Sequence, residues 1–192
     1  MNVLLRQEYK PVSCELNFAL NLKTLRLENY EKDLPANGRK NLAGALHENF
    51  RLIKCDTPQD KELAYKIIAQ NRAAKGYPLR MTWEQVKETI KIVPHDFFVV
   101  FKDDTPVASA IVFHVAEKIV QVIYWGNIPD KSSAKSMNYL AYKLTAHYHE
   151  RGMTYIDIGY STEDGVPNYG LCNFKQSIGC EIGTKLVMEK IF

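Results

Sequence analysis

The stretch HDFFVVFKDDTPVASAIVFHVAEKIVQVIYWGN (95–127) is the strongest structural signal in this chain of 192 residues. Its apolar and β-branched residues fall into three runs, at 95–102, 105–116 and 118–127. Two acidic residues separate the first pair of runs, and a turn around Glu117 separates the second pair. Connections this short join antiparallel strands. The stretch therefore predicts a three-stranded antiparallel meander.

Two helices and a strand are expected before this meander. FRLIKC (50–55) has the composition of a strand. Thr57 has the side chain of an N-cap and begins a helix that ends at Gly76. Thr82 begins a second helix, which Pro94 stops.

Helices and strands also alternate after the meander. We expect a helix at 133–151, a strand at 153–160, a helix at 169–177 and a strand at 181–192. A helical crossover between two strands allows them to be parallel neighbours. The order predicts an α/β (α+β) protein with a mixed, mostly antiparallel central sheet flanked by helices.

The N-terminal part, 1–49, is predicted to be an extension that packs on a core spanning 50–192. ELNFALNLKT (15–24) alternates apolar and polar positions like a half-buried strand, and short helices are expected at 27–33 and 36–48. The strand has no obvious place in the order of the core. It could instead pair across two chains, so a homodimer is a hypothesis.

The bulk composition excludes several classes of protein. The formal net charge is only +3 and basic residues do not cluster, so no DNA partner is expected. The four cysteines form no CxxC pair and lie far from histidines, which argues against a metal site. No apolar run approaches the roughly 20 residues that cross a bilayer. Because the N-terminus also lacks the apolar core of a signal peptide, we expect a cytoplasmic protein without a membrane partner.

Three motifs resemble the FemAB-like branch of the GNAT acyltransferases. LPANGRKNLAGA (34–45) is similar to the basic helix of that branch. FKDDTPVASAIVFHVAEKIVQVIYWG (101–126) resembles its central strands. IDIGYSTEDGVPNYGLCNFKQSIGC (156–180) resembles its Phe-Asp-Phe-Gly and Gly-Leu-x-x-Phe-Lys-x-x-Phe-Gly segments and is the most specific of the three. The resemblance covers about residues 34 to 192 and implies a GNAT-type fold and transfer of an acyl or aminoacyl group to an amine.

The chain departs from that family in two ways. GNAT enzymes that bind acetyl-CoA usually carry a glycine-rich loop whose N–H groups hold the pyrophosphate at a helix N-terminus. PDKSSAKSMNYL (129–140) stands there without a glycine, although Ser132, Ser133, Lys131 and Lys135 offer hydroxyls and positive charge. Fem-type proteins also usually contain two GNAT halves, and this chain is long enough for one. A thioester such as acyl-CoA is the expected donor, and an aminoacyl-tRNA is an alternative.

The resemblance places the site where two parallel central strands part, which here are the strands that carry Tyr124-Trp125 and Asp157. Of Tyr124 and Trp125, which point to opposite faces, one is expected in the core and the other in a cleft. Asp157, inside a strand, is either catalytic or part of a structural hydrogen bond. The residues that follow it, Tyr160, Ser161 and Thr162, leave a strand end where α/β proteins bind ligands.

Further candidates lie on helices. Asn168 is a natural N-cap, and Leu171, Phe174 and Ile178 have the spacing of a core face. Lys175 then falls on the opposite face, either as a solvated lysine or as a contact for an anionic substrate. Polar residues near the first two helices of the core and on the basic helix could contact the acceptor: Arg72, Asn71, Tyr77, Arg39 and Lys40.

Two functions are compatible with this pattern. The first is an acyltransferase that uses the candidates above. The second is a GNAT-like scaffold that has lost the pyrophosphate loop and binds a partner or a small ligand. An open polar cleft between the two parting strands would favour the enzyme, and a gap filled by side chains would favour the scaffold.

Overall fold

A seven-stranded sheet forms the centre of the computed structural model, which describes residues 2–129 and 134–191. The strand order is β2-β3-β4-β5-β6-β1-β9, and all neighbours are antiparallel except β5 and β6. The strands are β1 (Lys10–Asn21), β2 (Phe50–Lys54), β3 (His95–Lys102), β4 (Thr105–Ala116), β5 (Ile119–Asn127), β6 (Tyr155–Tyr160) and β9 (Glu181–Glu189). The predicted meander is confirmed as β3, β4 and β5. The hairpin between β3 and β4 turns at Asp103, whose φ of 53° lies in the left-handed region that short hairpin turns require.

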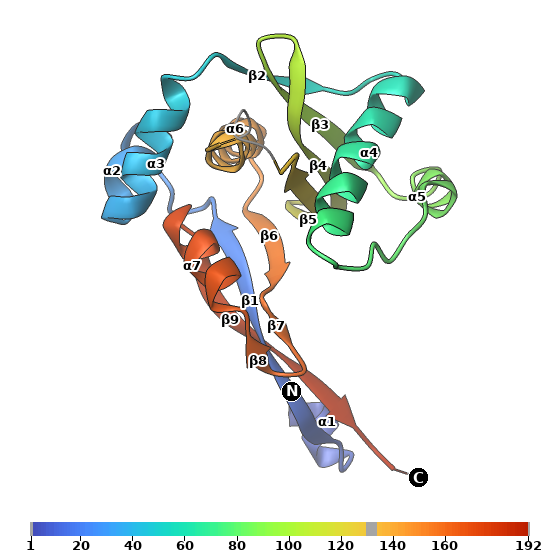
Figure 1. The fold of residues 1–192 in the computed structure, drawn as a ribbon. Coiled ribbons are helices and arrows are strands. Elements are labelled where there is room, and N and C mark those ends of the chain that lie inside the picture. Colours follow the sequence, from blue (N-terminus) through green and yellow to red (C-terminus); the bar gives the residue numbers. More distant parts are fainter. Residues whose placement is uncertain (1, 130–133, 192) are drawn as a thin grey trace.

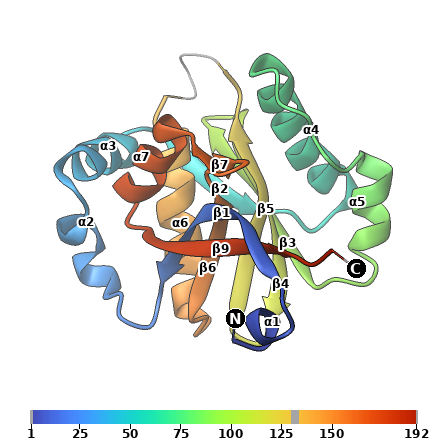
Figure 2. The same cartoon turned by 90° about the horizontal axis from the view of Figure 1, so that it is seen from below.

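Helices cover both faces of the sheet, so the molecule has three layers (Figures 1 and 2). Figure 2 shows α4 and α5 on one side and the remaining long helices on the other. The helices are α1 (Asn2–Arg6), α2 (Tyr30–Asp33), α3 (Ala36–Leu46), α4 (Pro58–Ala74), α5 (Trp83–Thr89), α6 (Ser136–Glu150) and α7 (Tyr169–Ser177), with a 3-10 turn at Leu27–Asn29. The sequence thus predicted the type and order of the main elements, whose ends differ by a few residues, but not the short helix α1.

Capping residues define where the two helices before the meander begin. The side chain of Thr57 accepts a hydrogen bond from the Asp60 N–H at the start of α4. Thr82 and Gln85 form a reciprocal capping box at the start of α5. These side chains satisfy N–H groups that the first turn of a helix leaves free, which is why the sequence located both starts correctly.

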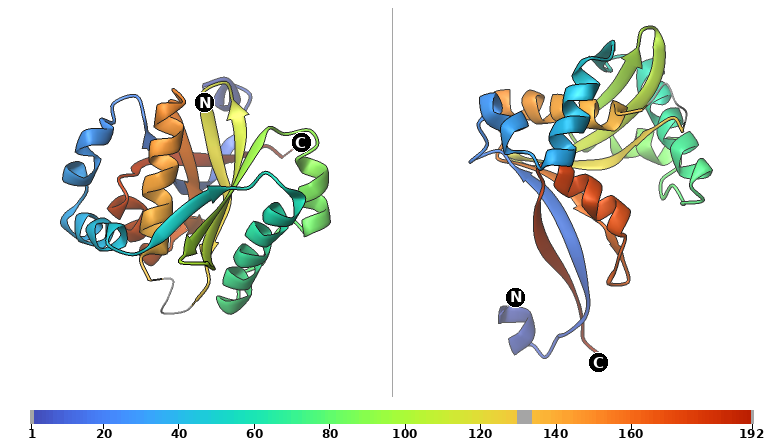
Figure 3. Two further views of the ribbon diagram at one scale, coloured as in Figure 1. Left: turned by 90° about the horizontal axis from the view of Figure 1, so that it is seen from above. Right: turned by 60° about the vertical axis from the view of Figure 1, so that its left-hand side comes forward.

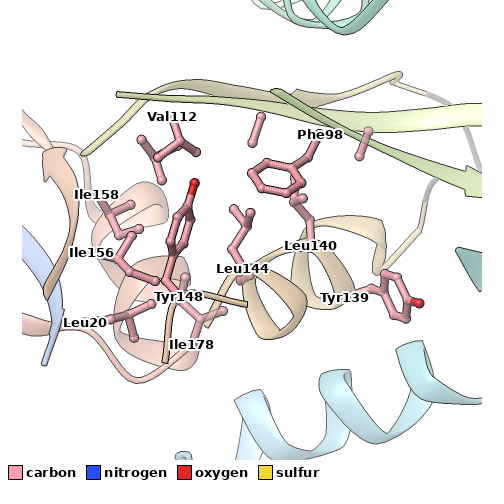
Figure 4. Packing of buried hydrophobic residues seen from close by; sticks show 14 of the residues in the cluster. Leu20, Phe98, Val112, Tyr139, Leu140, Leu144, Tyr148, Ile156, Ile158 and Ile178 are labelled. Atoms are coloured by element: carbon pink, nitrogen blue, oxygen red, sulfur yellow. The ribbon is translucent and has the colours of Figure 1, made fainter. Parts of the chain in front are cut away.

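The main core lies between the sheet and α6. Figure 4 shows Leu140, Leu144 and Tyr148 along one side of α6, facing Phe98 of β3 and Ile156 of β6. All five side chains are buried. Burying a side chain of this size stabilises the fold by about 1.5–3 kcal/mol. The spacing of four residues along α6 puts its three side chains on one helix face.

The strand β1 lies inside the sheet. It pairs with β6 on one side and β9 on the other. Beyond β6, the ribbon of β1 and β9 projects from the body, and both termini lie near its tip (Figures 1 and 3). The expectation that this segment lacks a place in the core order was therefore wrong. A homodimer stays a prediction, which light scattering at micromolar concentration would test.

A small hairpin that the sequence did not predict follows β6. It consists of β7 (Thr162–Glu163) and β8 (Val166–Pro167). Its turn contains Asp164 and Gly165, both with positive φ. The carboxylate of Glu15 on β1 binds this hairpin by accepting hydrogen bonds from the Thr162 hydroxyl and from the Gly165 N–H. The loop before α7 is thereby tied to the sheet.

Candidate functional site

The two parallel strands part halfway along their length. Hydrogen-bonded pairing between β5 and β6 covers only Ile119–Gln121 against Tyr155–Asp157. After Gln121, β5 continues to Asn127 with β4 as its partner, while the end of β6 pairs with β1. The carboxyl ends of both strands therefore border a gap in the sheet, as expected from the sequence. Open α/β sheets bind ligands where the carboxyl ends of two neighbouring strands part in this way.

Tyr124 and Trp125 at the end of β5 point to opposite faces, as predicted. Tyr124 is buried in the core under α4 and α5, and its hydroxyl accepts a hydrogen bond from the Met81 N–H at 3.2 Å. Trp125 lies on the other face, where its ring centroid is 5.8 Å from that of Phe174 on α7. Trp125 is thus the member of the pair at the gap, and the two aromatic rings occupy part of it.

Among the predicted site residues, Lys175 is the one whose exposure to solvent differs most from the prediction. Its side chain is 2% exposed, whereas Leu171, predicted for the core, is 38% exposed. The buried residues of α7 are Cys172, Lys175 and Ser177. The other two predicted core residues are confirmed, because Ile178 just after the helix is buried and Phe174 packs against the main core. Lys175 finds acceptors inside the protein. Its Nζ donates to the carbonyl oxygens of Gly159 at 2.9 Å and Tyr160 at 3.0 Å.

Burial changes the acid–base chemistry of this lysine. Removal from water lowers the pKa of Lys175 to about 8, although the nearby Cys180, Cys172 and Asp157 act to raise it. Its Nζ also lies 5.3 Å from the ring centre of Phe18. The ammonium has three N–H groups, and two of them are used by the carbonyls. A buried, protonated amine with one remaining donor therefore sits at the end of β6.

Asp157 is part of a polar network on the opposite face from the buried Ile156 and Ile158. Its carboxylate accepts hydrogen bonds from Asn17 at 3.1 Å, Gln121 at 3.3 Å and its own chain at Gly159. Lys185 on β9 forms an ion pair with it at 3.0 Å. Four donors saturate this carboxylate, so it holds β1, β5, β6 and β9 together.

The three residues that follow Gly159 differ in exposure. Tyr160 is 45% exposed, while Ser161 and Thr162 are buried. The Ser161 hydroxyl is buried without a hydrogen-bond partner among the described residues. Thr162 donates to Glu15 and accepts from the Leu16 N–H, so it links β7 to β1. Gly159 has a φ of 78°, which interrupts the side-chain alternation just before these residues.

The segment before α6 is described only in part. Lys131, Ser132 and Ser133 lie outside the described residues. Lys135 precedes α6 with a φ of 64°, and its side chain lies against Gly44 of α3. Ser136, the first residue of α6, was not among the predicted candidates. It is fully buried, and its hydroxyl has no partner among the described residues. Such an orphan hydroxyl at a helix start suits an incoming polar group.

Arg72 lies near the end of β5. Its neighbour Asn71 is buried and donates to the carbonyl oxygen of Asn127 at 2.6 Å. This contact fastens the end of α4 to the end of β5, next to the gap. The Nε of Arg72 is buried without a partner among the described residues. The other predicted acceptor contacts, Tyr77, Arg39 and Lys40, have exposed side chains.

Two further features, a metal site and a membrane-spanning helix, are absent from the described residues. Within residues 2–129 and 134–191, no group of three or more histidine, cysteine, aspartate or glutamate side chains is arranged to hold a metal ion. Over the same residues, no helix is long and apolar enough to span a bilayer.

Comparison with known proteins identifies the fold. No protein-family model matches the chain, and no curated protein matches it. Solved structures do match. FemX superposes with a TM-score of 0.75 at 11% identity over 95% of this chain and 66% of its own. L-PGS from Bacillus licheniformis gives 0.70 at 14% identity, over 98% of this chain and 63% of its own. A GCN5-related N-acetyltransferase from Kribbella flavida gives 0.54 at 15% identity, over 97% and 61%.

These similarities establish a GNAT/FemAB-like fold, as the sequence motifs predicted. At such low identity they define the fold alone, because one fold supports many activities. The chain spans about two thirds of FemX and somewhat less of the other two structures. Activities that depend on the remaining parts of those proteins are therefore matters for proposal.

Proposed function

We propose that the chain is an acyltransferase that moves an acyl or aminoacyl group from a thioester or a tRNA ester to an amine. The observation that carries the proposal is the buried Lys175 ammonium at the point where β5 and β6 part. The fold shared with FemX and with a GCN5-related N-acetyltransferase supports it.

The chemistry needs stabilisation of negative charge. When an amine attacks an acyl carbonyl, charge develops on the carbonyl oxygen. Because the pKa of Lys175 is about 8, this side chain carries a proton at pH 7. The carbonyls of Gly159 and Tyr160 hold its Nζ in place, so it can donate its third N–H without reorganisation. Exclusion of water strengthens such an interaction.

Neighbouring side chains supply the other functions. Trp125 and Phe174 provide an apolar wall for the acyl group. As the N–acyl bond forms and the bond to the thiolate or alkoxide breaks, the amine nitrogen loses one proton, and Tyr160 or Ser161 passes a proton to the leaving group. Asp157 is a positioning residue in this scheme, because its carboxylate is occupied by four donors. Arg72 and Ser136 are the proposed polar contacts of the substrates.

Calorimetry followed by a transfer assay tests the proposal. The full chain is titrated with acetyl-CoA, with longer acyl-CoAs and with aminoacyl-tRNA, and the donor that binds is then assayed with amine acceptors. We expect Lys175→Met to lower the transfer rate about 100-fold, as loss of one oxyanion donor does. Lys66→Met is the matched control, because Lys66 on α4 is exposed and forms an ion pair with Glu62 on the same helix.

Two outcomes would contradict the proposed acyltransferase activity. The first is that no thioester and no aminoacyl-tRNA binds, which would leave a GNAT-like scaffold whose gap is closed by Trp125 and Phe174. The second is a folded Lys175→Met variant that retains full transfer activity. If that variant does not fold, Lys175→Arg, which retains a buried cation, and Trp125→Ala at the acyl wall provide the comparison.

A further inference from the structure

The two edges of the sheet differ in how well they resist pairing with another chain. One edge, β2, is a strand of five residues with charged side chains at Arg51 and Lys54. The other edge, β9, is nine residues long, contains no proline and has β1 as its sole neighbour in the described sheet. Short, charged edge strands resist pairing, whereas a long edge with exposed apolar side chains favours it. β9 is therefore the edge to which a further strand can add.

Apolar side chains are exposed along this edge. Ile182 is 51% exposed and Val187 is 49% exposed, and Ile191 just beyond the strand is 88% exposed. The end of β9 that carries Val187 pairs with the beginning of β1. This is the outer part of the ribbon, which projects from the body (Figures 1 and 3). It offers apolar side chains and the unpaired backbone groups of an edge strand to a partner.

Charge along β9 selects a second copy of the same strand as that partner. Antiparallel pairing of two β9 strands centred on Val187 places Lys185 of each chain opposite Glu189 of the other. Opposite charges directly across a strand pair are favourable, and like charges are unfavourable. A centre two residues earlier, on Lys185, would oppose lysine to lysine and Glu181 to Glu189. The strand is thus complementary to itself in particular registers.

Distance separates the two registers in which Lys185 meets a carboxylate. A centre on Gly183 pairs Lys185 with Glu181, but it leaves the Glu181 residues of the two chains only about 13 Å apart, at the end of β9 that joins the body. The centre on Val187 separates the same residues by about 40 Å. Because the two bodies then lie beyond opposite ends of the paired segment, the register centred on Val187 is the one that avoids their collision.

The remaining side chains also fit this register. Val187 meets its own copy at the centre. Ile191 lies opposite Gly183, and a Cβ atom at Gly183 would have no other atom within 4 Å, so this position has space for the isoleucine. On the other face of the strand, Leu186 lies opposite Met188, and both are half-buried. Two-fold symmetry makes each contact away from the centre occur twice.

We propose that β9 pairs with β9 of a second copy of this chain in the antiparallel register centred on Val187, which makes the sheets of the two chains continuous. The surface differs from the one expected from the sequence, because β1 is occupied on both sides. The short, charged edge β2 remains free, so assembly stops at two chains. The pairing does not use the gap between β5 and β6 and does not depend on the proposed acyl transfer.

Light scattering after size-exclusion chromatography, over chain concentrations from micromolar to millimolar, tests the proposal. We expect the mass to rise with concentration from that of one chain to that of two. Glu189→Lys and Lys185→Glu each oppose like charges twice and should weaken dimerisation about tenfold. An equal mixture of the two variants restores opposite charges at both positions. It should therefore form a heterodimer with the wild-type affinity.

Glu181→Lys is the matched control. It makes the same charge change on the same strand, but position 181 lies outside the register, so dimerisation should be unchanged. Lys185→Glu loses the ion pair with Asp157, and if it does not fold, Val187→Lys replaces it by bringing two positive charges together at the centre. Three results would overturn the proposal: a monomer at every concentration, a dimer that Glu189→Lys does not weaken, or a dimer that Glu181→Lys weakens as much.

Discussion

Lys175 shows how a single side chain can define a site. A buried lysine is uncommon, because its charge loses the hydration of water. Here two carbonyl oxygens at the end of β6 replace part of that hydration. They are available because the backbone bends at Gly159. The residue is therefore both a structural link between α7 and β6 and the proposed source of positive charge.

The pKa of Lys175 predicts a specific pH dependence of stability. It is about 8 in the folded protein and about 10.4 in an unfolded chain. Between these pH values the unfolded chain holds a proton that the folded chain has released. This group therefore makes the free energy of unfolding rise from about pH 8 to about pH 10, and contributes no slope below about pH 7.

Urea denaturation across this pH range measures the effect. We expect Lys175→Met to remove the rise and Lys66→Met to retain it. The thiol of Cys180, whose pKa burial raises to about 12, contributes a slope of the opposite sign in all three proteins, so only differences between them are compared. If the free energy of unfolding depends on pH in the same way in wild type and Lys175→Met, the lowered pKa of the buried Lys175 is contradicted.

At the scale of elements, the contact between α3 and α7 depends on a glycine. Gly38 is buried on α3, and a Cβ atom there would lie 1.8 Å from the backbone oxygen of Ser177, at the end of α7. Glycines weaken a helix in isolation, so Gly38 has no local reason to lie in this one. The structure explains its presence, because only a residue without a side chain lets α7 approach α3 so closely.

We expect Gly38→Ala to lower the free energy of unfolding by about 1–3 kcal/mol, as overpacking does. The displaced α7 carries Lys175, so the variant should also weaken donor binding. Gly170→Ala on α7 is the control. Its Cβ would have ordinary contacts, the nearest at 3.6 Å, so this variant should be neutral or up to about 1 kcal/mol more stable. Chemical denaturation of both variants checks this, and equal stabilities would contradict the close approach.

At the scale of the molecule, the N-terminal strand β1 connects β9 to the rest of the sheet. β1 is the partner of both β6 and β9, and β9 has no other neighbour in the described sheet. Phe18 and Leu20 of β1 are buried in the main core. Residues 50–192 therefore lack a strand that their own sheet requires.

Truncation tests this dependence. We expect removal of residues 1–22 to abolish cooperative thermal unfolding, since it deletes β1 and exposes its apolar contacts. Removal of residues 1–8, which takes away only α1 and the turn after it, should change the melting temperature by no more than a few degrees. Circular dichroism on heating compares the two. A cooperative transition in the longer truncation would show that residues 23–192 fold without β1.

The sequence alone determined the main helices and strands, their order and the fold class, because caps, turns and apolar periodicity are local. The resemblance to FemAB-like proteins indicated the strand ends at Trp125 and Tyr160, which border the place where β5 and β6 part. Only the tertiary structure decided the position of β1, because strand pairing over this separation depends on which edge remains open. Only the tertiary structure showed that Lys175 is buried. The carbonyl oxygens that accept its hydrogen bonds belong to a different element, so they leave no periodic pattern in the sequence of α7.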